Sequence, residues 1–252
     1  MCTLLLAYDV DPAHRVVIAA NRDEHYGRRT APIATWSDRQ SVIGGRDLEG
    51  GGTWMGLTRS GRWAALTNVR IPGEAPAKRS RGELVVDFLD GSGSAISYLQ
   101  VLSTREDVYG GFNLVVGDSS GVYYWSNRAG ASPSAVRPGI YGISNAAFDT
   151  PWPKVERGKA ALAALVERGE VTTDALLELL SDRQGYADAA LPDTGVGIAV
   201  ERALAPLFVA MPGYGTRSST ALLLGRDQRA RISELTVEPG PGGRVDLELE
   251  LG

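Results

Sequence analysis

The opening of the chain decides the fold, because it holds two short apolar segments on either side of a polar break. Residues 1–9 are Met-Cys-Thr-Leu-Leu-Leu-Ala-Tyr-Asp, and residues 16–24 are Val-Val-Ile-Ala-Ala-Asn-Arg-Asp-Glu. The Asp-Val-Asp-Pro segment at 9–12 predicts a turn between them. Continuous apolar runs of this length predict strands that are buried on both faces. The chain therefore begins with a predicted strand–loop–strand unit.

Three further hairpins are predicted along the chain. Pairs of short apolar segments around turns that contain Gly or Asp cover residues 53–67, 112–126 and 220–236. This pattern is typical of paired antiparallel strands. Residues 245–251 alternate apolar and acidic side chains, which predicts a half-exposed edge strand.

Helices are predicted between these hairpins from apolar residues three and four apart. The predicted helices cover residues 81–89, 94–102, 153–168 and 172–180. Residues 185–206 lack periodicity, so we expect a long loop or a flexible lid there. Hairpins with a few interposed helices indicate one α+β domain over residues 1–252.

Composition and charge exclude several classes of protein. The chain has 252 residues, of which 43% are hydrophobic, and a net charge of −4, so we expect a globular protein that does not bind nucleic acid. Its one cysteine excludes an intramolecular disulfide and a cluster of zinc-binding thiolates. Its two histidines, His14 and His25, cannot form a three-histidine metal site. We therefore predict no metal site and no required cofactor.

Nothing in the sequence predicts a membrane span or an export signal. The longest purely aliphatic stretch, residues 160–166, is far shorter than the roughly 20 residues that cross a bilayer. The N-terminal apolar run has no basic segment before it, which is not typical of a signal peptide. We therefore expect a cytoplasmic protein.

Cys2 is the first candidate for chemistry. If Met1 is removed, Cys2 carries a thiol and a free α-amine, whose ordinary pKa values are about 8.5 and about 7.7–8.0. One residue then supplies both a nucleophile and a base, which is the logic of N-terminal nucleophile amidohydrolases. The alternative is an inert buried thiol, because free cysteine is among the most buried residue types.

Four polar residues, Asn21, Arg22, Asp23 and Glu24, end the second predicted strand abruptly. In one interpretation, Arg22 forms a structural salt bridge that ties down the following loop. In a functional site, Arg22 would orient an acidic group or the amine of Cys2, and Asp23 would accept a hydrogen bond from that amine. Both interpretations stay open at this point.

Three asparagines lie at or inside strand ends, namely Asn68, Asn113 and Asn145. An asparagine amide directed at a developing oxyanion is a catalytic device, although asparagine is equally common in turns and caps. Two glycine-rich segments end at Trp54 and at Arg217. Their backbone amides would approach an anionic ligand, or the segments are simply tight turns.

Short motifs follow one another along nearly the whole chain. They are Met-Cys at 1–2, ANRDE at 20–24, GGTWMG at 51–56, AALTN at 64–68, RGEL at 81–84, GFNL at 111–114, YGISN at 141–145, TPW at 150–152 and GYGTR at 213–217. This ordered set resembles the NRDE-motif family, the family of the transport and Golgi organization protein 2. The resemblance implies an N-terminal nucleophile hydrolase-like fold, an αββα sandwich of two antiparallel sheets between helical layers. Cys2 would begin its first strand.

The resemblance also implies a site. Related cysteine amidases of the choloylglycine hydrolase type place an arginine and an aspartate near the thiol, and an asparagine at a later strand end. With the residues above, the predicted catalytic set is Cys2, Arg22, Asp23, Asn68 and Asn145. The predicted ligand-binding residues are Asn21, Glu24, Trp54, Asn113 and Arg217. Because Arg22 and Asp23 are adjacent, an extended strand should direct their side chains oppositely.

Two functions are predicted for a small-molecule pocket at Cys2. The first is an amidohydrolase that cleaves a C–N bond with Cys2 as nucleophile. The second, implied by the family, is a non-catalytic carrier of haem or of acyl-CoA or lipid. Its cationic mouth would consist of Arg22, Arg28, Arg29 and Arg217. The candidate haem ligands are Cys2, His14 and His25. A scaffold without a ligand pocket is a third interpretation.

Overall fold

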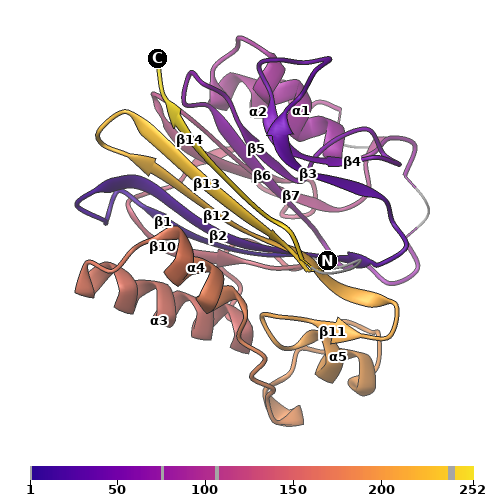
Figure 1. Ribbon diagram of the computed structural model, residues 1–252. Coiled ribbons are helices and arrows are strands. Elements are labelled where there is room, and N and C mark those ends of the chain that lie inside the picture. Colours follow the sequence, from indigo (N-terminus) through magenta and orange to yellow (C-terminus); the bar gives the residue numbers. More distant parts are fainter. Residues whose placement is uncertain (1, 75–76, 106–107, 238–241) are drawn as a thin grey trace.

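The computed structural model describes residues 2–74, 77–105, 108–237 and 242–252, and in this part of the chain two antiparallel sheets are stacked face to face (Figure 1). The strands of the first sheet are β1 (Cys2–Tyr8), β2 (His14–His25), β10 (Gly139–Ile143), β11 (Ala210–Met211), β12 (Tyr214–Gly225), β13 (Arg229–Thr236) and β14 (Arg244–Glu250). They lie in the order β10-β1-β2-β12-β13-β14, with β11 paired to β12.

The second sheet follows the chain in simple order. Its strands are β3 (Thr30–Thr35), β4 (Ile43–Asp47), β5 (Met55–Leu57), β6 (Trp63–Asn68), β7 (Phe112–Asp118), β8 (Gly121–Ser126) and β9 (Ser134–Ala135). They pair in the order β3-β4-β5-β6-β7-β8-β9. The hairpins that the sequence predicts are present as β5–β6, β7–β8 and β12–β13, and β14 lies at a sheet edge.

Helices cover the outer face of each sheet (Figure 1). The helices are α1 (Gly82–Asp90), α2 (Ala95–Leu102), α3 (Pro153–Arg168), α4 (Thr173–Leu180), α5 (Ile198–Leu204) and a 3-10 turn, η2 (Asp188–Ala190). The helices α1 and α2 pack on the second sheet, whereas α3 and α4 pack on the first. The predicted αββα architecture is therefore confirmed.

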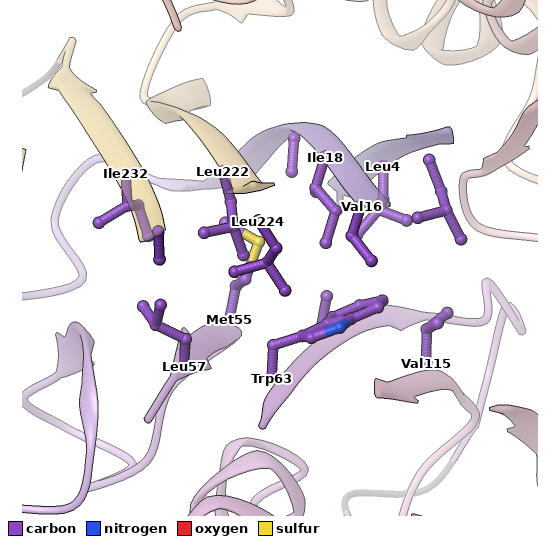
Figure 2. Packing of buried hydrophobic residues seen from close by; sticks show 14 of the residues in the cluster. Leu4, Val16, Ile18, Met55, Leu57, Trp63, Val115, Leu222, Leu224 and Ile232 are labelled. Carbon is purple, nitrogen blue, oxygen red and sulfur yellow. The ribbon is translucent and has the colours of Figure 1, made fainter. Parts of the chain in front are cut away.

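Alternation along the strands explains why the opening of the chain is apolar on every residue. In β1, Leu4 and Leu6 belong to the core between the sheets, whereas Leu5 and Ala7 belong to the core under α3 and α4. Figure 2 shows the core between the sheets, with Leu4 opposite Trp63. Successive strand residues point to opposite faces, so both faces of this sheet need apolar side chains.

The segment at 185–206 is not the unstructured loop that its composition predicts. It contains η2 and α5, and Glu201 of α5 is only 3% exposed. The Glu201 carboxylate accepts hydrogen bonds from Arg70 at 2.9 Å and from the Thr194 backbone at 2.8 Å. This buried ion pair holds the segment against the body of the protein. Within the described ranges, no helix has the length and apolarity needed to cross a bilayer.

Candidate functional site

A pocket of about 320 Å³ lies at the end of the sandwich where β1 begins and β2 ends. This volume falls in the range of small-molecule sites. Six of the ten predicted catalytic and ligand-binding residues line it, namely Cys2, Arg22, Asp23, Glu24, Trp54 and Asn68. Because Cys2 opens onto a pocket, the interpretation as a scaffold without one does not describe this end of the molecule.

Cys2 occupies the first position of β1, where it pairs with Arg22 of β2. Its carbonyl accepts a hydrogen bond from the Ser144 hydroxyl at 3.2 Å, which ties the strand start to the end of β10. Burial raises the pKa of the Cys2 thiol, and the Asp23 carboxylate raises it further, whereas the Arg22 guanidinium lowers it. Burial therefore has the largest influence on the pKa of the thiol, and the two neighbouring residues act on it in opposite directions.

Arg22 lies on the face of β2 that is turned toward the second sheet, the same face as its pairing partner Cys2. Its guanidinium lies 4.5 Å from the centre of the Trp54 ring, a cation–π contact. Arg22 Nη2 is 3.8 Å from Asp47 Oδ2, too long for a hydrogen bond. Arg22 Nη1 is buried and has no hydrogen-bond partner among the described residues.

Asp23 follows Arg22 but points to the opposite face of β2, as expected for an extended strand. It is 1% exposed, and its Oδ1 accepts a hydrogen bond from Thr216 Oγ1 at 2.8 Å. Burial raises the pKa of the Asp23 carboxyl, and Lys154 and the Thr216 hydrogen bond oppose that change.

Lys154, in the first turn of α3, is a buried cation that sequence reasoning missed. It is 3% exposed, and its Nζ donates to the Leu204 carbonyl at 3.0 Å. Burial lowers the pKa of Lys154, whereas the nearby Asp23 carboxylate raises it. A buried charge is tolerated when an opposite charge lies close, so Asp23 and Lys154 support each other. The TPW motif before Lys154 was the only signal for this position.

Asn68 and Asn145 lie next to each other, but only Asn68 lines the pocket. Asn145 Nδ2 donates to the backbone carbonyl of Asn68 at 2.8 Å, and Asn145 Oδ1 accepts from the Ser144 hydroxyl at 3.3 Å. Asn145 binds the backbone of Asn68, and no side-chain hydrogen bond joins the Asn68 amide to another described residue. Asn145 thus holds the Asn68 backbone at the pocket edge.

The side chains of Asn21, Asn113 and Arg217 lie outside the pocket lining and are engaged elsewhere. Asn21 Nδ2 donates to two backbone carbonyls, those of Leu180 and Leu207, both at 2.9 Å. Asn113 Nδ2 donates to Thr67 Oγ1 and to the Ala146 carbonyl. Arg217 donates to the carbonyls of His25, Tyr26 and Arg28. These contacts account for the three residues structurally, and their predicted ligand-binding role gains no support from them.

A basic wall that sequence reasoning missed forms another side of the pocket. We use this name for residues 77–82, Ala-Lys-Arg-Ser-Arg-Gly, which all line it. The wall is held by backbone contact, because the Thr53 N–H donates to the Gly82 carbonyl at 3.1 Å. A Cβ on Gly52 would lie 2.3 Å from the Gly82 carbonyl carbon. Glycine is therefore required at position 52 by close approach.

Of the three candidate haem ligands, only Cys2 lines the pocket. His14 Nδ1 is 2.8 Å from Asp11 Oδ1, near the β1–β2 turn at the opposite end of these strands. The His25 ring packs edge-on against Tyr214 at 5.1 Å between centroids. Of the proposed cationic mouth, Arg22 and Arg28 line the pocket, whereas Arg29 and Arg217 do not.

Solved structures with similar folds are N-terminal nucleophile hydrolases. The chain superposes on a Caenorhabditis elegans N-acylethanolamine-hydrolyzing acid amidase ortholog with a TM-score of 0.55 and 11% identity, over 88% of this chain and 92% of that one. A variant of the conjugated bile acid hydrolase from Clostridium perfringens superposes with a TM-score of 0.51 and 11% identity, over 97% and 92% of the two chains. At this identity the likeness concerns the fold alone.

Sequence relatives are much closer. The Transport and Golgi organization protein 2 homologs of Bos taurus and Homo sapiens are each 36% identical over 93% of this chain and 92% of their own length. The sequence model of the family described as Transport and Golgi organisation 2 matches residues 1–239. The resemblance carried by the ordered motifs is confirmed, and the chain belongs to the Transport and Golgi organisation 2 family.

Proposed function

We propose that the protein is an N-terminal cysteine amidohydrolase that cleaves a C–N amide bond of a small molecule, with Cys2 as its nucleophile. The observation that carries this proposal is the position of Cys2. The one thiol of the chain lies in a pocket beside Arg22, Asp23 and Asn68. The hydrolase-like scaffold of the neighbouring structures agrees with this chemistry.

In the proposed reaction, removal of Met1 first frees the α-amine of Cys2. The thiol proton passes to this amine, and Sγ adds to the amide carbonyl carbon. The C–N bond then breaks, the ammonium returns the proton to the leaving nitrogen, and an acyl thioester stays on Cys2. Water adds to the thioester, which releases a carboxylic acid and restores the thiol.

The surrounding residues have distinct proposed roles. Arg22 lowers the pKa of the thiol and so favours the nucleophilic thiolate. The Asn68 amide, at the pocket edge, is the proposed donor to the oxyanion. Asn145 acts through Asn68, because it binds the Asn68 backbone carbonyl. Asp23 orients the freed amine, and its contact with Thr216 fixes its own position.

The test is mass spectrometry of the intact protein after exposure to an activated acyl donor. We expect a chain that begins at Cys2 and gains one acyl group, which is then lost by hydrolysis. Cys2→Ala should gain none, and Cys2→Ser should gain it far more slowly. Arg59→Glu, an exposed change outside the pocket lining, is the matched control. Retained Met1, or a native thiol that stays unlabelled while the denatured chain labels readily, contradicts the proposal.

The carrier function is the second candidate, and the environment of the half-buried thiol favours it. Because burial raises the pKa of Cys2, the neutral thiol is favoured, as suits a binding pocket more than a nucleophile. The same experiment separates the two functions. A hydrolase forms and loses the acyl group, whereas a carrier binds the acyl donor or haem reversibly without covalent change to Cys2.

A further inference from the structure

The pocket carries a positive charge that the rest of the molecule does not. The whole chain has a net charge of −4, yet five basic and three acidic side chains line the pocket. The basic residues are Arg22, Arg28, Lys78, Arg79 and Arg81. A cleft with an excess of one sign of charge concentrates ligands of the opposite sign.

The acidic residues neutralise this charge only in part. Arg28 is paired with Asp47. Arg79 is paired with Glu83, which lies outside the pocket lining. Among the described residues, Arg22 has no carboxylate within hydrogen-bond distance, and Lys78 has no ion-pair partner.

Asp47 accepts hydrogen bonds from the backbone N–H groups of Glu49 and Gly50, both at 3.0 Å, and from Arg28 Nε at 2.8 Å. Both of its oxygens are therefore occupied, and its distance from Arg22 Nη2 is 3.8 Å. Arg22 is 6% exposed and lines the pocket with a buried Nη1 that has no partner among the described residues. A buried donor of this kind calls for an acceptor oxygen.

The basic wall adds a second set of donors. Ser80 Oγ and Arg28 Nη2 lie close together, because both would contact a Cβ placed on Gly50, at 2.9 and 3.3 Å. The helix α1 begins at Gly82, which also lines the pocket, and a helix N-terminus attracts negative charge. Lys78 is exposed and has no ion-pair partner in the part of the chain that the structure describes.

We propose that the ligand of this pocket carries an anionic oxygen group, a carboxylate or a phosphate, which binds between Arg22, Arg28 and the basic wall. The proposal rests on the proposed function only in taking this pocket as the ligand site. It narrows the proposed ligands to acylated amines, or other acyl compounds, that carry a carboxylate or a phosphate. Neutral long-chain amides are poor ligands of such a site, because their apolar surface does not satisfy its donors.

The test measures binding without turnover. Calorimetric titration of the whole protein at low ionic strength uses inorganic phosphate, glutarate and, as the neutral probe, glutaramide. We expect at least one anion to bind more tightly than glutaramide and its affinity to fall as salt is added. Lys78→Glu should weaken this binding about fivefold or more, whereas the same charge reversal at the distant Arg59 should leave it within about twofold.

Each outcome decides the proposal. Binding of phosphate alone indicates a phosphate-bearing ligand, binding of glutarate alone indicates a carboxylate, and binding of both supports an anion site that does not discriminate. Anions that bind no better than glutaramide, or equal affinities for the Lys78→Glu and Arg59→Glu proteins, overturn it. The titration repeated on Cys2→Ala separates this result from the proposed chemistry, because anion binding does not need the thiol.

Discussion

The two faces of β2 near the end of the strand differ in how their polar side chains are hydrogen-bonded. On the face toward the helices, Asn21 makes hydrogen bonds with the Leu180 and Leu207 carbonyls and with Ser219 Oγ, the last at 2.6 Å. On the face toward the second sheet, Arg22 lines the pocket, and its buried Nη1 has no hydrogen-bond partner among the described residues. A polar side chain whose hydrogen bonds are all made within the protein stabilises the fold. One that lines a pocket and has a donor left over can bind a ligand.

The largest expected effect comes from Asn21. The change Asn21→Ala leaves two buried carbonyls and one hydroxyl without this partner, which we expect to lower the free energy of unfolding by about 3 kcal/mol. Urea unfolding measures the loss. The matched change on the other face, Arg22→Gln, should cost less than half as much, because no side chain of the described residues forms a hydrogen bond with the Arg22 guanidinium. Equal losses would remove the distinction between the faces.

Glu234 of β13 gives a second test of the face toward the second sheet, because its carboxyl is buried on that face. Burial raises its pKa to about 6 from its ordinary 4.5. The stability that it contributes is therefore full below about pH 4.5 and is lost as the pH rises through about 6, a loss of about 2 kcal/mol. Glu234→Gln does not titrate, so its free energy of unfolding should gain about 2 kcal/mol relative to the parent between pH 4 and pH 7.

Unfolding by urea at several pH values measures this difference. A control is Glu248→Gln, at an exposed residue of β14, which should show no comparable change across the same interval. A parallel pH dependence of the parent and Glu234→Gln proteins would contradict the expectation.

The smallest effect concerns the two neighbours of the thiol. Arg22 lowers the pKa of Cys2 and Asp23 raises it. Arg22→Gln should therefore shift the pH profile of Cys2 alkylation to higher pH, because less thiolate forms at a given pH. Asp23→Asn should shift the profile to lower pH. Rates with iodoacetamide, a neutral reagent, report both shifts, and the one cysteine of the chain makes the site of reaction unambiguous.

Shifts of the same sign in these two variants would contradict the opposite effects of Arg22 and Asp23 on the pKa of the thiol. The two variants can be compared directly, because Arg22 and Asp23 are adjacent in the chain and both act on the Cys2 thiol. Thr216→Val supplies a control for Asp23, since it removes the hydrogen bond at 2.8 Å but leaves the carboxylate in place. It should move the profile less than Asp23→Asn does.

Much of the fold could be predicted from the sequence, because the strands of the central hairpins are short apolar segments joined by turns that contain Gly or Asp. The strands β3 and β4 could not. They contain Pro32 and the pair Gly44-Gly45, which disfavour strands in isolation, and they form because neighbouring strands pair with them. The helix α5 was missed for a similar reason, since it is short and follows Gly195 and Gly197.

The site divides in the same way. Cys2, Arg22 and Asp23 could be predicted, because abrupt polar residues at strand ends mark a sheet edge. Asn113 was predicted from its place in a strand end and Arg217 from the glycine-rich segment before it, yet both residues hold strands and turns together. The sequence pattern does not say which face of a strand end meets a pocket. The basic wall was missed because a long-range backbone contact brings it to Cys2, and no local pattern records that contact.

The close approach of Gly52 to Gly82 has a consequence for how ligand preference can change. The position of the basic wall against the segment before β5 is set by two backbones in contact, not by side chains. We therefore expect substitutions at Lys78 or Ser80 to alter the charge of the wall while the contact between Gly52 and Gly82 stays in place. The charge that the basic wall presents to a ligand can thus change while the place of its backbone in the fold stays the same.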